Sequence, residues 1–410
     1  MLDPDVAPPV AEDQRLDSEG GFRDLAPVVS AITAVSLPSF LVATLAVQMR
    51  GDLNFGPALL GVVVGAASAS SAVFAFPSGA LAERVGGVRT LRGAAVVAAA
   101  ALLAVALWAR SWPVLAAILV VAGAASSAAQ TSSNLILSRR VPAGRQGLAF
   151  GIKQSAVPLA FLLGGAAVPT LGLTVGWRWA FVAAAALALG SAVVIPPSRT
   201  TFRRHLRQSS HRRRSEPARP LVTLAIGFAL ALMACSSLSA FLVSSAVAAG
   251  VGRGPAGLVA VLASISGISV RVATGVRADR RAGGHFPTVT AMIAVGAVGF
   301  LMLALASGLR SPVILIPGAM VAFGIGWGWN GLFNFAVVRT HPLAPARASG
   351  ITQTGGRAGS VLGPLLFGLL VSHLGYAPAW GVAAAEALAG AGVLLVGRRQ
   401  LQARMGSELE

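Results

Sequence analysis

The feature that most limits the fold of this chain is a series of long apolar runs that recurs along its length. A run of about 20 apolar residues can cross the hydrocarbon core of a membrane as an α-helix. Each span must satisfy its own backbone polar groups, and the runs lack the alternation typical of barrel strands. The sequence therefore predicts an all-α membrane protein with twelve transmembrane helices at 25–48, 59–81, 93–109, 113–137, 148–170, 177–197, 220–248, 255–276, 286–308, 312–338, 348–372 and 378–397.

Composition agrees with a membrane protein and argues against several other classes. Hydrophobic residues make up 55% of the chain and charged residues 11%, whereas a soluble domain averages about 25% charged. The net charge of +18 does not indicate a nucleic-acid partner, because the arginines are spread over short loops and only 6% of residues are aromatic. The histidines lack metal-ligand spacing and no nucleotide-binding glycine motif is present, so we expect no metal, no cofactor and no enzyme activity.

The distribution of positive charge predicts the orientation of the spans. With both termini in the cytoplasm, the inner segments hold 24 basic residues, and the outer loops hold five: Arg50, Arg110, Arg178, Arg253 and Arg310. The positive-inside rule then places a multi-pass protein in the plasma (inner) membrane with both termini cytoplasmic. Residues 1–24 carry seven acids, and we expect this tail to be disordered.

Two segments of the first half return in the second half. The stretch "GALAERVGGVR" (79–89) returns as "GVRADRRAGG" (275–284), and "GIKQSAVPLAFLLGG" (151–165) returns as "GITQTGGRAGSVLGP" (350–364). This indicates an internal duplication. We predict a tail (1–24), an N-terminal six-helix half (25–198), a basic linker (199–219), a C-terminal six-helix half (220–397) and a cytoplasmic tail (398–410). Such halves suit a carrier that rocks around a midplane site.

On these residues the sequence resembles the major facilitator superfamily. The loop motif of that family is matched by Gly79, Glu83, Arg84 and Gly86, and again by Gly275, Asp279, Arg280 and Gly283. The resemblance implies two six-helix pseudo-symmetric halves and a conformational latch made of Glu83, Arg84, Asp279 and Arg280. Glu83 would face the start of span eleven near Arg347, and Asp279 the start of span five near Arg145. A carboxylate is favoured at a helix N-terminus by the dipole and the free amides.

Three cations fall inside the spans: Lys153, Arg271 and Arg357. At about 1.5 Å per residue, Lys153 lies roughly 8 Å and Arg271 roughly 9 Å from the inner ends of their spans, and Arg357 roughly 15 Å. Arg357 shares a helix face with Gln353 by i, i+4 spacing. Lys153 and Arg271 are shallow enough that snorkelling to the inner surface stays open as an alternative.

Acids that would neutralise these cations are scarce. Only Glu386 lies within a span, in the peripheral span twelve, where it is a candidate proton carrier. An excess of buried positive charge favours a small anionic substrate. Polar groups on the helices that line the cavity in this family add candidate substrate contacts: Gln130, Asn134, Trp327, Asn330 and Asn334. The alternative for these side chains is hydrogen bonding between spans, worth about 0.6 kcal/mol each.

These features favour a secondary transporter that moves a small organic carboxylate across the plasma membrane by alternating access, with proton symport. The alternative is a proton-driven exporter of hydrophobic or drug-like compounds, which would need an essential acid such as Glu386. A receptor or scaffold without transport is a third hypothesis. We expect a monomer whose partners are the small-molecule substrate and the lipid bilayer.

Overall fold

The structure is a computed structural model that describes residues 25–141, 146–195, 218–280, 285–341 and 345–407. Every regular element in these residues is helical. In chain order the helices are α2 (Leu25–Leu53), α3 (Pro57–Val73), α4 (Ala75–Val85), α5 (Gly87–Trp108), α6 (Trp112–Arg140), α7 (Gln146–Gln154), α8 (Ala156–Ala167), the π-helix η2 (Val168–Gly176), α9 (Trp177–Val194), α10 (Ala218–Ala248), α11 (Arg253–Arg280), α12 (His285–Leu309), α13 (Pro312–Gly328), α14 (Asn330–Thr340), α15 (Pro345–Leu374) and α16 (Tyr376–Ser407).

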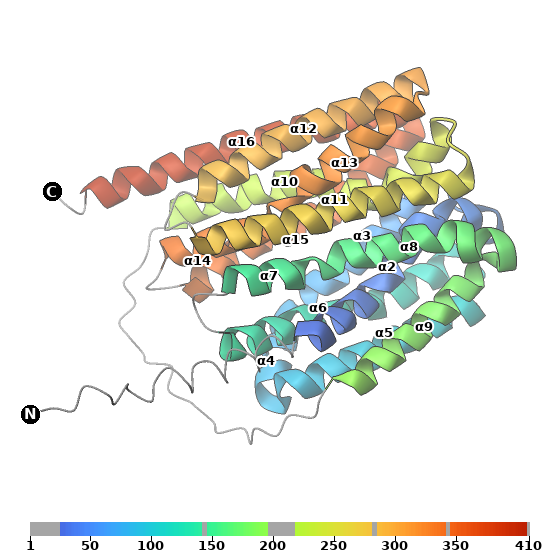
Figure 1. The fold of residues 1–410 in the computed structure, drawn as a ribbon, viewed down its shortest axis with the longest axis horizontal. Helices are drawn as coiled ribbons and strands as arrows, with labels where there is room; N and C mark the ends of the chain where they lie inside the picture. The colour runs from blue at the N-terminus through green and yellow to red at the C-terminus, as the bar shows by residue number, and fades with distance from the viewer. Residues whose placement is uncertain (1–24, 142–145, 196–217, 281–284, 342–344, 408–410) are drawn as a thin grey trace, which may run out of the picture.

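The number of spans follows from two breaks in these helices. Within the described residues ten helices are long and apolar enough to cross a membrane, and the bent pair α3 and α4 adds an eleventh. One of the ten, Gly147–Val194, is 48 residues long, about twice what a crossing needs. It reverses direction between α8 and α9 (Figure 1). Gly176, the last residue before α9, has a φ of +101°, which glycine tolerates best. Counting it as two spans gives the twelve that the apolar runs predict.

The helices form two groups that follow the chain order. In Figure 1 the helices coloured blue to green fill the lower part of the molecule, and those coloured yellow to red fill the upper part. Helix α2 begins and α16 ends at the same end of the bundle, as an even number of spans requires. Helix α16 continues to Ser407, beyond the predicted end at 397, because residues 398–405 are good helix formers without glycine or proline.

The two groups meet along two seams. Span two (α3) packs on span eleven (α15), and span five (α7 and α8) packs on span eight (α11). The second seam is close enough to need glycine: a Cβ on Gly257 would lie 2.5 Å from the Gly165 carbonyl oxygen, and one on Gly165 would lie 2.6 Å from that of Gly257. Small residues are the usual means by which membrane helices approach each other in this way.

The first seam is closed where α3 begins and α15 ends, at the end of the bundle opposite to the start of α2. We call this end the outer end and the other the inner end, after the predicted orientation (Figure 1). At the outer end the Ala58 amide donates to the Ser372 hydroxyl at 3.1 Å. A Cβ on Gly61 would lie 2.2 Å from the Pro364 carbonyl oxygen. Toward the inner end, span two bends by 50° between α3 and α4, and α4 packs on α5 and α6 of its own half. The outer halves of spans two and eleven therefore touch, while the inner half of span two turns toward its own half.

Candidate functional site

The single lysine of the chain is bound by two of the predicted site residues. Lys153 lies in the last turn of α7, and its side chain is only 3% exposed. Its ammonium donates to Gln130 Oε1 and to Asn134 Oδ1, both at 2.7 Å. These two amides lie one turn apart on α6, so they face the same side of that helix. An ammonium has three N–H donors, and two of them donate here to uncharged amide oxygens.

The C-terminal half repeats this arrangement with a neutral donor. Gln353 of α15 donates from Nε2 to Asn334 Oδ1 at 2.7 Å, and Asn334 donates from Nδ2 to Asn330 Oδ1 at 3.2 Å. Donor and asparagine are 19 residues apart in both halves. The two halves thus hold similar contacts, one from the charged Lys153 and one from the uncharged Gln353. The donors are not equivalent positions of the repeat, which aligns Lys153 with Thr352 and Gln154 with Gln353.

Arg271 is buried on α11 against the aromatic residues of α13. It is 4% exposed, it donates from Nη2 to the Trp327 carbonyl oxygen at 3.0 Å, and its guanidinium lies 5.4 Å from the Trp327 ring centroid. Its Nη1 is buried and has no hydrogen-bond partner within the described residues. Burying a donor of a charged group without an acceptor is costly, so this nitrogen is available to an added acceptor.

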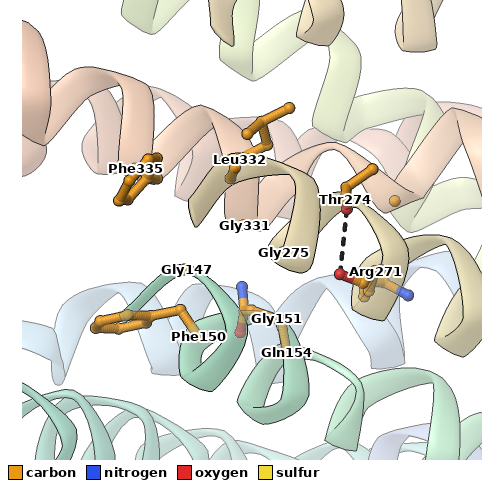
Figure 2. A pocket seen from close by; sticks show the side chains of 12 residues that line it. Gly147, Phe150, Gly151, Gln154, Arg271, Thr274, Gly275, Gly331, Leu332 and Phe335 are labelled. Atoms are coloured by element: carbon orange, nitrogen blue, oxygen red, sulfur yellow. Dashed lines mark hydrogen bonds between the residues drawn. The ribbon is translucent and has the colours of Figure 1, made fainter. Parts of the chain in front are cut away.

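A small cavity lies beside Arg271, between spans five, eight and ten. Figure 2 shows Phe150 and Gln154 of α7 on one side, Arg271 and Thr274 of α11 on another, and Phe335 of α14 beyond them. The Thr274 hydroxyl donates to the Arg271 carbonyl oxygen at 3.1 Å. The cavity has about 20 Å³ of free space, which suits about one water molecule. In this conformation it is too small for an organic substrate.

Aromatic rings bridge the two halves above this region. Phe161 of α8 stacks on Phe323 of α13 with ring centroids 5.0 Å apart, and it meets Phe40 of α2 edge-on at 5.7 Å. Phe323 in turn contacts Trp327 at 4.9 Å. Trp327, a candidate substrate contact with contacts between spans as the alternative, is 8% exposed and contacts both Phe323 and Arg271. Phe40, Phe161 and Phe323 could not be identified from the sequence, because a phenylalanine that faces the other half has the same sequence signal as one that faces lipid.

Arg357 lies apart from the other two cations, at the opposite seam. This half-buried side chain of α15 donates from Nη1 to the Ser71 carbonyl oxygen of α3 at 2.6 Å. The three cations therefore have separate partners: Lys153 on α6, Arg271 on α13 and Arg357 on α3. The sequence analysis did not anticipate the backbone partner of Arg357.

The predicted latch is only partly within the described residues. Glu83 and Arg84 are exposed at the end of α4, and Arg280 is exposed at the end of α11. Arg347 is exposed too, and the described part of the chain shows no ion pair between it and Glu83. Arg145 and the side chain of Asp279 lie outside the part of the chain that the structure describes.

Glu386 lies on the periphery of the molecule. It is half-buried on α16 and lines a hollow with apolar side chains of α15 and α16: Leu366, Leu369, Leu370 and Val382, with His373 at the end. Lys153, Arg271 and Arg357 are not among the residues that line this hollow. The structure thus separates this carboxyl group from the predicted substrate contacts.

Comparison with known proteins agrees with this architecture. The family model for the Major Facilitator Superfamily matches residues 28–360. Two curated relatives from Mycobacterium tuberculosis strains, both named as uncharacterized MFS-type transporters, are 27% identical over 299 residues. That match covers 70% of this chain and 65% of each relative, so the chain spans about two thirds of their length.

Two solved structures share the fold at low sequence identity. A mutant of the nucleoside transporter NupG superposes with a TM-score of 0.71 at 15% identity, covering 91% of this chain and 99% of that one. A D-xylose-proton symporter superposes with a TM-score of 0.74 at 14% identity, covering 91% and 97%. With its twelve spans, its duplicated halves and the family match over most of its length, the chain belongs to the Major Facilitator Superfamily.

Proposed function

We propose that this protein is a secondary transporter that moves a small organic anion, a carboxylate, across the plasma membrane by alternating access with proton symport. One observation carries the choice of substrate: the buried Lys153 ammonium is held by two neutral amide oxygens. Within the described residues no carboxylate pairs with it. A cation buried in a membrane span is costly, and a substrate carboxylate would supply both the missing charge and an acceptor for the third ammonium proton.

The two halves would then contact different parts of the substrate. Lys153, with Gln130 and Asn134, offers a charged donor from the N-terminal half. Gln353, with Asn334 and Asn330, offers only neutral amides from the C-terminal half. This asymmetry favours a monocarboxylate whose other end carries a neutral polar group. The unpartnered Nη1 of Arg271 is a second donor for the carboxylate.

The exporter alternative has less support. An exporter of weakly basic compounds needs an acid in the transport path that pairs with its cationic substrate, and Glu386 lies in a peripheral hollow among leucines. The two solved neighbours are named for nucleoside and xylose transport. At 14 and 15% identity these neighbours support the fold only, so the substrate class has to be argued from the side chains of this protein.

Thermal unfolding of the detergent-purified protein tests the substrate class. We would screen small monocarboxylates, dicarboxylates, inorganic anions and hydrophobic amines against the parent, the Lys153→Gln variant and the Arg110→Gln variant. Arg110 is an exposed cation of an outer loop, so its variant controls for a simple loss of positive charge. We expect monocarboxylates to raise the melting temperature of the parent and of Arg110→Gln, and to have no effect on Lys153→Gln.

Other outcomes would redirect the proposal. Stabilisation by amines alone, equal in all three proteins, would contradict the anion site and favour the exporter. Uptake of the stabilising acid into proteoliposomes, measured with and without an inward proton gradient, tests the coupling. Uptake that does not respond to the gradient would contradict proton symport.

A further inference from the structure

The break in span two has a cause in the sequence. Helix α3 ends at Val73 and α4 begins at Ala75, with Phe74 between them, and their axes differ by 50°. Pro77 lies in the first turn of α4. A proline has no amide hydrogen, and its ring clashes with the carbonyl four residues earlier, which is Val73. A continuous helix is therefore disfavoured at this point.

The break leaves a backbone acceptor that a side chain of the other half takes up. In an unbroken helix the Ser71 carbonyl would accept from the Ala75 amide. The backbone bonds across the break include Phe74 to Ser70 and Ser78 to Phe74, and not Ala75 to Ser71. The Arg357 guanidinium of α15 donates to the Ser71 carbonyl oxygen at 2.6 Å instead.

Charge reinforces this contact. The last carbonyls of a helix carry partial negative charge, and a cation beside them is stabilising. Arg357 is half-buried, and a hydrogen bond from a charged donor is stronger than one between neutral groups. Ser71 is three residues from the break, so within the described part of the chain its oxygen has no backbone partner while span two is bent. In the straight form the same oxygen would also accept from the Ala75 amide, and the bond from Arg357 would then contribute less stabilisation.

The bend decides where the inner half of span two lies. Helix α3 packs along α15, so a straight span two would continue beside α15 toward the inner end. The bent α4 packs on α5 and α6 instead. Its exposed side chains include Phe76 at 87% and Val85 at 43%. Straightening span two would bring α4 toward α15 and close the inner end of this seam.

We propose that Arg357 is a positioning residue that stabilises the bent form of span two through its hydrogen bond to the Ser71 carbonyl. In this way it holds the seam between spans two and eleven open at its inner end. Withdrawal of the guanidinium from Ser71 then favours the straight form and inner closure. The device acts on the conformational equilibrium of the empty protein, so it does not depend on the substrate class proposed above.

Distance measurements between spin labels test this device without any ligand. Labels are placed at Val85→Cys on α4 and Gly350→Cys on α15, in a Cys235→Ala background. Val85 is exposed, and a side chain at Gly350 meets nothing within 4 Å. We expect Arg357→Gln to shift the populations from the long to the short distance by about tenfold or more, since a bond from a charged donor is worth about that much.

Two further variants separate this role from a structural one. Pro77→Ala, which allows the Ala75 amide to reach Ser71, should shift the distances in the same direction with Arg357 in place. Combined with Arg357→Gln it should add little, because both changes act on one carbonyl. Ser360→Ala removes a half-buried hydroxyl of α15 that bonds within its own helix, and it should leave the distances unchanged.

Two results would overturn the proposal. The first is a distance distribution that is unchanged in both Arg357→Gln and Pro77→Ala. The second is an additive effect of the two changes, which would mean that they act at separate places. If Arg357→Gln abolished carboxylate binding and left the distances unchanged, Arg357 would be a direct substrate ligand: the anion proposal would stand and the positioning role would fall.

Discussion

At the scale of single residues, the charge of one donor distinguishes two otherwise similar contacts. Lys153 donates to Asn134 in the N-terminal half, and Gln353 donates to Asn334 in the C-terminal half, each at 2.7 Å. The spacing of Gln130 and Asn134 on one face of α6 was predictable from the sequence. The sequence left snorkelling of Lys153 open, and its 3% exposure decides for burial. That these three side chains bind one another was not predictable, because each had several polar candidates at the same depth.

The two halves provide a matched pair for measuring the effect of that charge. Asn134→Leu should lower the stability of the protein more than Asn334→Leu, because the former deprives a buried ammonium of an acceptor. A hydrogen bond with a charged partner is worth roughly 1.5–3 kcal/mol, whereas one between neutral groups of two spans is worth about 0.6 kcal/mol. Thermal unfolding of both variants in the same detergent checks this. Equal losses would mean that water or lipid reaches Lys153 readily.

At the scale of helices, glycines set the distance between spans five and eight. Gly165 and Gly257 face each other so closely that a Cβ on either would meet the carbonyl oxygen of the other at 2.6 and 2.5 Å. The composition of the spans, with 48 glycines in the chain, predicts close packing in general. Which of these glycines face a helix and which face lipid depends on the rotation of each span, and the tertiary structure establishes that.

This packing is tested by substituting one glycine that faces the neighbouring helix and one that faces lipid. Gly257→Ala should lower the melting temperature, because the added methyl group forces α11 away from α8 and overpacking costs roughly 1–3 kcal/mol. Gly392→Ala on α16, where a Cβ meets nothing within 4 Å, should leave stability unchanged or raise it, since alanine is the better helix former. Unfolding curves of the two variants give the comparison. A similar loss of melting temperature in both variants would show that α8 and α11 can move apart at little cost in stability.

At the scale of the molecule, the halves contact each other unevenly. The seam of spans five and eight is packed from Gly165 and Gly257 down to Gly151, where a Cβ would lie 2.9 Å from the Arg271 carbonyl oxygen. The other seam is closed at Ala58 and Ser372 near the outer end, and below Phe74 its span two turns aside. The internal repeat predicted two halves and could not predict this asymmetry, which coincides with the helix break before Pro77 and the contact of Arg357 with Ser71.

Orientation in the membrane is testable by labelling from each side. In a Cys235→Ala background, Arg310→Cys should react with an impermeant maleimide added to intact cells, and Arg399→Cys only after permeabilisation. Both arginines are exposed; Arg310 directly follows α12 and Arg399 lies near the end of α16. These two helices end at opposite ends of the bundle (Figure 1), and the excess of inner positive charge predicts which end is cytoplasmic. Labelling of Arg399→Cys in intact cells would show that the orientation is the reverse of the predicted one.

The order of residues alone predicts the number of spans, the duplication, the orientation and the shortage of buried acids. These depend on the cost of placing polar groups in hydrocarbon and on charge counts, which need no knowledge of neighbours. The contacts that carry the proposals depend on the fold. Arg357 and Ser71 are 286 residues apart, and no periodicity relates a side chain of one half to a backbone carbonyl that a proline releases in the other. Only the packing of α3 against α15 brings them together.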